Sequence, residues 1–108
     1  RVPIALEIDG RDANGEWTLG KYIITDTELA QTFVDTLNQM EKAEARKSFD
    51  RMEADWDVMV AGYRQCLCHL HIAPDMMWVD NWVYEADCGP MYELLNEIIQ
   101  LRKAGKID

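Results

Sequence analysis

Residues 49–72 read FDRMEADWDVMVAGYRQCLCHLHI, and the fold depends on which structure this stretch adopts. A helix has 3.6 residues per turn, so residues three or four apart lie on one face. Apolar residues at close to that spacing are Phe49, Met52, Trp56, Met59, Val60, Tyr63, Cys66, Leu67 and Leu70. The stretch is therefore predicted to be helical, with this stripe facing the core.

The helical pattern continues toward the N-terminus, where Leu29, Phe33, Val34, Leu37 and Met40 form a second stripe. The segment Thr25-Asp26-Thr27-Glu28 matches a capping box, in which the Thr25 hydroxyl caps the first turn. Residues 26–72 are therefore predicted to form one long helix or two consecutive helices that break near Ser48, a candidate second cap. Two helices are favoured, because one helix of about 45 residues would span roughly 65 Å. A single helix of that length would need a homodimer to bury its stripe.

The two ends of the chain have clearer patterns. Residues 2–24 are predicted to form a β-hairpin, because apolar and other residues alternate over 2–9 and turn-forming residues follow at 12–15. Residues 90–104 are predicted to form a C-terminal amphipathic helix, with Pro90 in its first turn and Gly105 at its end.

Residues 74–87 fit two structures. A helix is favoured, since Trp78 and Trp82 are four residues apart after Pro74. The alternative is a hairpin with strands Met76–Val79 and Trp82–Glu85 around an Asp80-Asn81 turn. Together these elements predict a single compact α+β domain over residues 1–108, in which the N-terminal hairpin packs against three or four α-helices.

Charge excludes some classes of partner. The 108 residues carry a net charge of −9, and the stretch from Gln65 to Leu101 has six carboxylates and no Lys or Arg. Binding to nucleic acid or to an anionic membrane needs clustered cations, so neither direct nucleic-acid binding nor membrane binding is expected. Three cysteines cannot all pair within one chain, and no apolar run approaches about 18 residues. A reducing cytoplasmic location is therefore predicted.

Four metal-ligand residues lie within six positions: Cys66, Cys68, His69 and His71. In a helix the two Cys/His pairs point apart, and in a strand the thiols and imidazoles take opposite faces. Structural zinc sites usually combine two separated short motifs. A zinc- or copper-binding module is therefore only an alternative hypothesis, in which a ligand pair could be completed by Cys88, Asp75 or Asp87. No cofactor is predicted.

An enzyme is the other alternative. If residues 49–72 are helical, Asp50, Glu53 and Asp57 share a face, as in a divalent-metal enzyme acting on phosphate esters. Interleaved lysines and arginines make an ion-paired, solvated face the better interpretation. The sequence also lacks a Gly-rich phosphate loop and a GxSxG motif. No catalytic residue is assigned.

The favoured function is a small acidic, non-enzymatic protein-binding module. Tryptophan dominates binding hot spots, and an acidic rim attracts a basic protein surface. The predicted contact residues are Asp75, Trp78, Asp80, Trp82, Glu85 and Asp87. A sharper hypothesis is an inhibitor or DNA mimic that binds a nucleic-acid-handling protein. The competing interpretation is that both tryptophans belong to the core.

Overall fold

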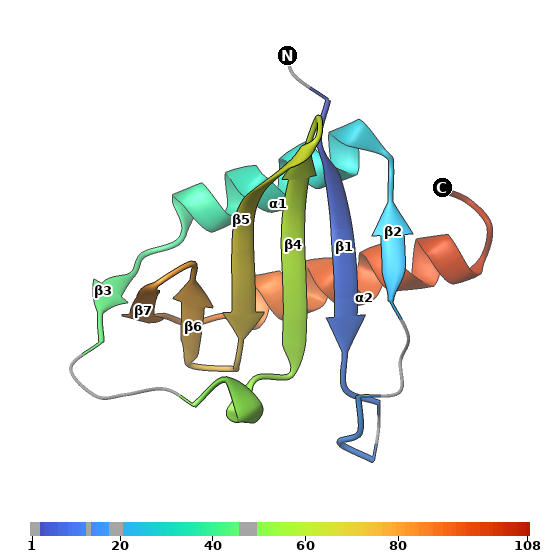
Figure 1. Ribbon diagram of the computed structural model, residues 1–108. Helices are drawn as coiled ribbons and strands as arrows, with labels where there is room; N and C mark the ends of the chain where they lie inside the picture. The colour runs from blue at the N-terminus through green and yellow to red at the C-terminus, as the bar shows by residue number, and fades with distance from the viewer. Residues whose placement is uncertain (1–2, 13, 18–20, 46–49) are drawn as a thin grey trace.

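The computed structural model describes residues 3–12, 14–17, 21–45 and 50–108, and this part of the chain forms an antiparallel β-sheet with two α-helices (Figure 1). Its seven strands are β1 (Ala5–Gly10), β2 (Tyr22–Ile24), β3 (Ala43–Glu44), β4 (Trp56–Gly62), β5 (Gln65–Ile72), β6 (Met76–Val79) and β7 (Trp82–Glu85). Their order across the sheet is β2-β1-β4-β5-β6-β7-β3. The α-helices are α1 (Thr27–Gln39) and α2 (Gly89–Lys103), and a short 3-10 helix, η1, spans Arg51–Glu53.

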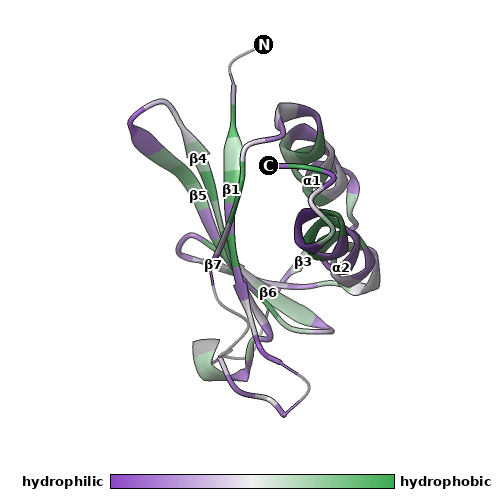
Figure 2. Cartoon of the chain, turned by 90° about the vertical axis from the view of Figure 1, so that its right-hand side faces the viewer, coloured by the Kyte–Doolittle hydropathy of each residue, from purple (hydrophilic) through white to green (hydrophobic). Residues whose placement is uncertain are grey.

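Both α-helices pack on the same face of the sheet (Figure 2). Because side chains alternate along a strand, every second strand residue points at the helices. The buried strand residues on this side are Leu6, Ile8, Val58, Val60, Leu70, Ile72 and Met77. The helices complete this core with Phe33, Leu37, Met91, Leu95 and Ile98.

The opposite sheet face, turned toward the viewer in Figure 1, carries no α-helix in the described part of the chain. Near β6 it has a small buried cluster of Ala54, Ala73 and Met76, against which Trp78 packs. Over β1, β4 and β5 the same face presents mainly polar side chains instead. We call this half the open face, and its main residues are the apolar Met59 and the polar Glu7, Asp9, Asp57, His69 and His71.

The helical prediction for residues 26–72 is wrong beyond the first stripe. α1 ends at Gln39, and residues 56–72 form the β4–β5 hairpin around the two-residue turn Tyr63–Arg64. Ser48, the predicted break, lies outside the described residues.

The reason for the error is visible in β4. Trp56, Val58 and Val60 are buried, while Asp57 and Met59 between them are only partly buried. Residues four apart share a face in a helix and in a strand alike, so Trp56 and Val60 do not distinguish the two. The β-branched and aromatic residues favour the strand, and pairing with β1 and β5 stabilises it.

The helix favoured over residues 74–87 is also wrong. The structure has β6 and β7 there, with Val79 paired to Trp82 across the Asp80-Asn81 turn. The predicted fold class is also wrong, because residues 56–72 and 76–85 form β-hairpins where helices were predicted. A hairpin packed against three or four helices is replaced by a seven-stranded sheet with two α-helices among the described residues.

The helix ends follow local chemistry. The N-cap of α1 is Asp26, whose Oδ1 accepts a hydrogen bond from the Leu29 backbone N–H at 3.1 Å. The predicted cap, Thr25, instead donates its backbone N–H to the Asp108 carbonyl at 2.9 Å. α2 has Pro90 in its first turn and is followed by Gly105 at φ +72°. Of the helices described, none has the length and apolar character needed to cross a bilayer.

Candidate functional site

Three metal-ligand side chains meet on the open face. Asp57 in β4 lies directly opposite His71 in β5, and Met59 lies opposite His69. The His69 Nε2 is 2.5 Å from Asp57 Oδ1, and the His71 Nε2 is 3.5 Å from Asp57 Oδ2. The two imidazole centroids are 4.6 Å apart. One ligand atom from each of the three residues lies within 4.8 Å of the other two.

A second carboxylate adjoins this group. Asp9 in β1 is directly opposite Asp57 on its other side. A hollow of about 170 Å³ lies along these residues and is lined by Glu7, Asp9, Lys21, Asp57, Met59 and His69. Carboxylates directly opposite each other in a sheet repel. Positive charge beside Asp57, from an imidazolium or a bound cation, would relieve this repulsion.

The predicted Cys/His ligand set does not assemble. Cys68 pairs with Val60, so it faces the helix-covered side, whereas His69 and His71 are on the open face. Burial, followed by the nearby Asp80 and Cys66, raises the pKa of the Cys68 thiol to about 11. Cys66 is exposed close to the β4–β5 turn. Among the described residues, the two histidines combine with Asp57 and not with a cysteine.

The predicted carboxylate set of the enzyme hypothesis is also not assembled. Asp50 precedes η1, and its Oδ1 accepts a hydrogen bond from the Met52 backbone N–H at 2.9 Å. Glu53 ends η1, and Asp57 lies on a strand. The predicted helix face that would hold Asp50, Glu53 and Asp57 together is therefore absent from the described part of the structure.

The predicted partner-binding residues separate along the β6–β7 hairpin. Asp80 and Trp82 are at its turn, where the Trp82 side chain is exposed. Trp78 lies opposite His71 and packs against the small apolar cluster. The other carboxylates gather at the far end of the hairpin, where Asp75, Glu85 and Asp87 line a hollow of about 510 Å³ together with Pro74, Met76 and Ala86.

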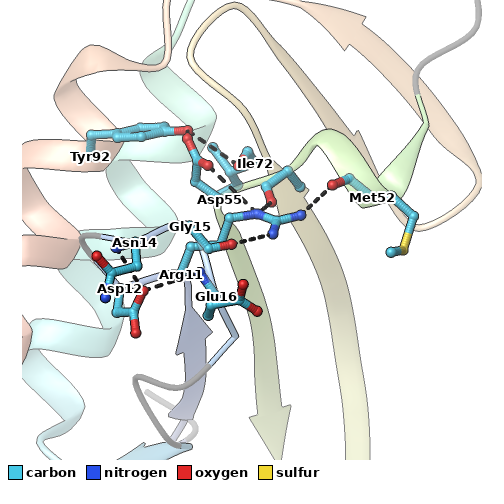
Figure 3. A network of polar contacts seen from close by, with 10 residues as sticks. Arg11, Asp12, Asn14, Gly15, Glu16, Met52, Asp55, Ile72 and Tyr92 are labelled. Atoms are coloured by element: carbon cyan, nitrogen blue, oxygen red, sulfur yellow. Dashed lines mark hydrogen bonds and ion pairs between the residues drawn. The ribbon is translucent and has the colours of Figure 1, made fainter.

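Sequence reasoning missed a polar network around Arg11 (Figure 3). The Arg11 guanidinium donates to the carbonyls of Gly15, Met52 and Ala54 and lies 3.8 Å from the Asp55 carboxylate. These contacts join the loop after β1 to η1 and the residues between η1 and β4. We regard this network as structural, because the Arg11 guanidinium donates to backbone carbonyls of both segments.

On its other side, the network reaches α2. The Tyr92 hydroxyl donates to Asp55 Oδ2 at 2.7 Å, and burial together with this bond raises the pKa of Tyr92 well above its usual range. The sequence signal for this network is weak, since Arg11, Asp55 and Tyr92 are far apart in the chain.

Comparison of the chain with protein-family models, with curated proteins and with solved structures gives no match in any of the three.

Proposed function

We propose that the protein binds a basic surface of another protein through the β6–β7 hairpin. The observation that carries this proposal is Trp82, which remains 60% exposed at the hairpin turn. A large aromatic side chain loses little conformational entropy when it is buried in an interface, and tryptophan is enriched among the residues that dominate binding. Trp78 is not part of the proposed contact, because it packs against the apolar cluster below the hairpin.

The charge around Trp82 selects the kind of partner. Asp80 lies beside it at the turn, and Asp75, Glu85 and Asp87 lie at the other end of the hairpin. A four-residue strand spans about 13 Å. Trp82 and Glu85 are three residues apart on β7 and point to opposite faces of the sheet. A partner would therefore bury Trp82 at the turn and reach around the hairpin to pair its Lys or Arg side chains with the carboxylates at the other end.

The test distinguishes binding through the hairpin carboxylates from attraction caused by the net charge of the protein. The protein is immobilised, a partner is captured from extract of the source cells and purified, and its affinity is measured over a range of salt concentrations. In the test variant, Asp75→Asn, Glu85→Gln and Asp87→Asn are combined. The matched control combines Asp35→Asn, Glu41→Gln and Glu97→Gln, which removes the same charge from exposed positions elsewhere.

We expect the hairpin variant to bind about tenfold more weakly, since each exposed charge pair contributes up to about 1 kcal/mol. The control variant should retain its affinity to within about twofold, and binding of the unmodified protein should weaken as salt rises. Equal losses in the two variants, or salt-independent binding, would overturn the proposal.

A further inference from the structure

We propose that Asp57, His69 and His71 form a binding site for a divalent transition-metal ion of the zinc class. The proposal is independent of partner binding at the β6–β7 hairpin, because it uses a different part of the sheet. Its basis is the register of β4 and β5, which sets Asp57 opposite His71 and next to His69. Both imidazoles direct Nε2 at the same carboxylate, one at each oxygen.

The distances suit an ion with short bonds. Zinc binds imidazole nitrogen and carboxylate oxygen at about 2.0–2.2 Å, so two ligand atoms on a tetrahedral ion lie about 3.3 Å apart. The contacts here are 2.5 Å and 3.5 Å, and the largest separation within the group is at most 4.8 Å. Shifts of about 1 Å in the side chains would bring all three to bonding distance of one ion.

The donor atoms select the metal. Two imidazole nitrogens and one carboxylate oxygen suit zinc, nickel, copper or iron, whereas magnesium and calcium prefer oxygen ligands alone. Three protein ligands leave a fourth position for water or a further group. The adjacent hollow of about 170 Å³ has room for it, since one water occupies about 30 Å³.

Charge on the open face favours a cation at this place. Among the described residues that border the hollow, there are three carboxylates, Glu7, Asp9 and Asp57, and one lysine, Lys21. Asp9 is paired with Asp57 across β1 and β4, so a bound cation would also offset their mutual repulsion. The competing explanation of the geometry is an ion pair between Asp57 and a protonated histidine without any metal.

The test titrates the chelator-treated full chain with zinc chloride by isothermal calorimetry. Three free cysteines could bind zinc by themselves, so Cys66→Ser, which removes the exposed thiol, is the matched control. We expect one zinc per chain and at least a tenfold loss of affinity in each of His69→Gln, His71→Gln and Asp57→Asn. Cys66→Ser should bind as the unmodified protein does, and magnesium chloride should give no binding heat.

Three results would overturn the site: unchanged zinc affinity in both histidine variants, loss of binding in Cys66→Ser, or no zinc binding by the unmodified protein. Circular dichroism of each variant confirms that it is folded. As a second readout, nickel chloride should quench tryptophan emission in the unmodified protein, because Trp78 lies directly opposite His71. Replacement of Trp78 by Phe should remove most of the quenching, and quenching unchanged in that variant would place the ion elsewhere.

Discussion

The β4–β5 and β6–β7 hairpins have similar construction and opposite surface chemistry. Each closes with a two-residue turn, and Arg64 and Asp80 at these turns are the described non-glycine residues with positive φ, at 58° and 54°. Each also exposes a large aromatic residue, with Tyr63 77% and Trp82 60% exposed. In the first hairpin the Arg64 guanidinium lies 5.1 Å from the Tyr63 ring centroid. In the second, the turn residue with positive φ is a carboxylate, Asp80, at the first turn position.

The two turns differ in what their side chains contact. The side chains of the Tyr63-Arg64 turn contact each other, whereas the Asp80 side chain is hydrogen-bonded to the neighbouring strand β5. Tyr63 and Arg64 interact with each other. Asp80 instead accepts a hydrogen bond from the His69 backbone N–H through Oδ1 at 3.0 Å, and its own N–H donates to the His69 carbonyl at 2.8 Å. The second turn is thereby fixed to β5, and Trp82 is held next to an acidic side chain on a supported strand end.

The largest expected difference between the two hairpins is in the affinity for a basic partner after loss of the exposed aromatic residue. Trp82→Ala should weaken binding of a basic partner by about 2 kcal/mol, or roughly 30-fold, as expected for a tryptophan that acts as a binding hot spot. Tyr63→Ala is the matched control, because it removes an equally accessible aromatic from the other turn. Calorimetric titration with the purified partner measures both variants. If Tyr63→Ala lost as much affinity as Trp82→Ala, the proposal that the partner binds at the β6–β7 hairpin would be wrong.

A second test concerns the two cysteines of β5. Cys66 is exposed near the turn, whereas burial raises the pKa of Cys68 to about 11. At pH 8 only about one Cys68 thiol in a thousand is ionised, and the Cys68 side chain is also less exposed than that of Cys66. Alkylation by iodoacetamide should therefore be at least tenfold slower at Cys68 than at Cys66, and each rise of one pH unit below 11 should speed it about tenfold.

Peptide mapping by mass spectrometry measures these rates. Cys88 is the internal control, because burial also raises its pKa to about 11. All three cysteines should react at similar rates in denaturant. Equal rates for Cys66 and Cys68 in the folded protein would contradict the assignment of Cys68 to the helix-covered side.

The local patterns of the sequence predict some elements and misplace others. Of the alternation over residues 2–9, the part from residue 5 onward lies in β1, which buries Leu6 and Ile8, and the helix-end signals at Pro90 and Gly105 match α2. These patterns succeed because each depends on residues close in the chain. The β4–β5 hairpin was missed because its spacing fits both periods, and because the pairing of β1 with β4 joins residues about fifty positions apart.

The candidate metal site shows the same limit. Asp57 belonged to the enzyme hypothesis, whereas His69 and His71 belonged to the Cys/His hypothesis. Only the β4–β5 register brings the carboxylate and the imidazoles together. Residues two apart in a strand share a face, so His69 and His71 are expected on one face of a strand. The helical prediction for residues 49–72 does not place Asp57 on a neighbouring strand opposite them. Binding of a basic partner and the DNA-mimic hypothesis stay predictions, because nothing in the described structure tests them.

The smallest expected difference between the two turns is in the free energy of unfolding after glycine substitution. Glycine adopts positive φ without the steric cost that other residues incur. Arg64→Gly should therefore raise the free energy of unfolding by about 0.5 kcal/mol, since relief of that cost exceeds the loss of an exposed contact with Tyr63. Asp80→Gly gains the same relief but removes the carboxylate that accepts the His69 backbone N–H, a charge-assisted hydrogen bond of about 1.5 kcal/mol, so it should lower the free energy of unfolding by about 1 kcal/mol. Urea denaturation at constant m-value measures both changes. Opposite signs follow only if Asp80 is held by β5 while Arg64 is not, so a gain in both variants would show that the two turns are equivalent.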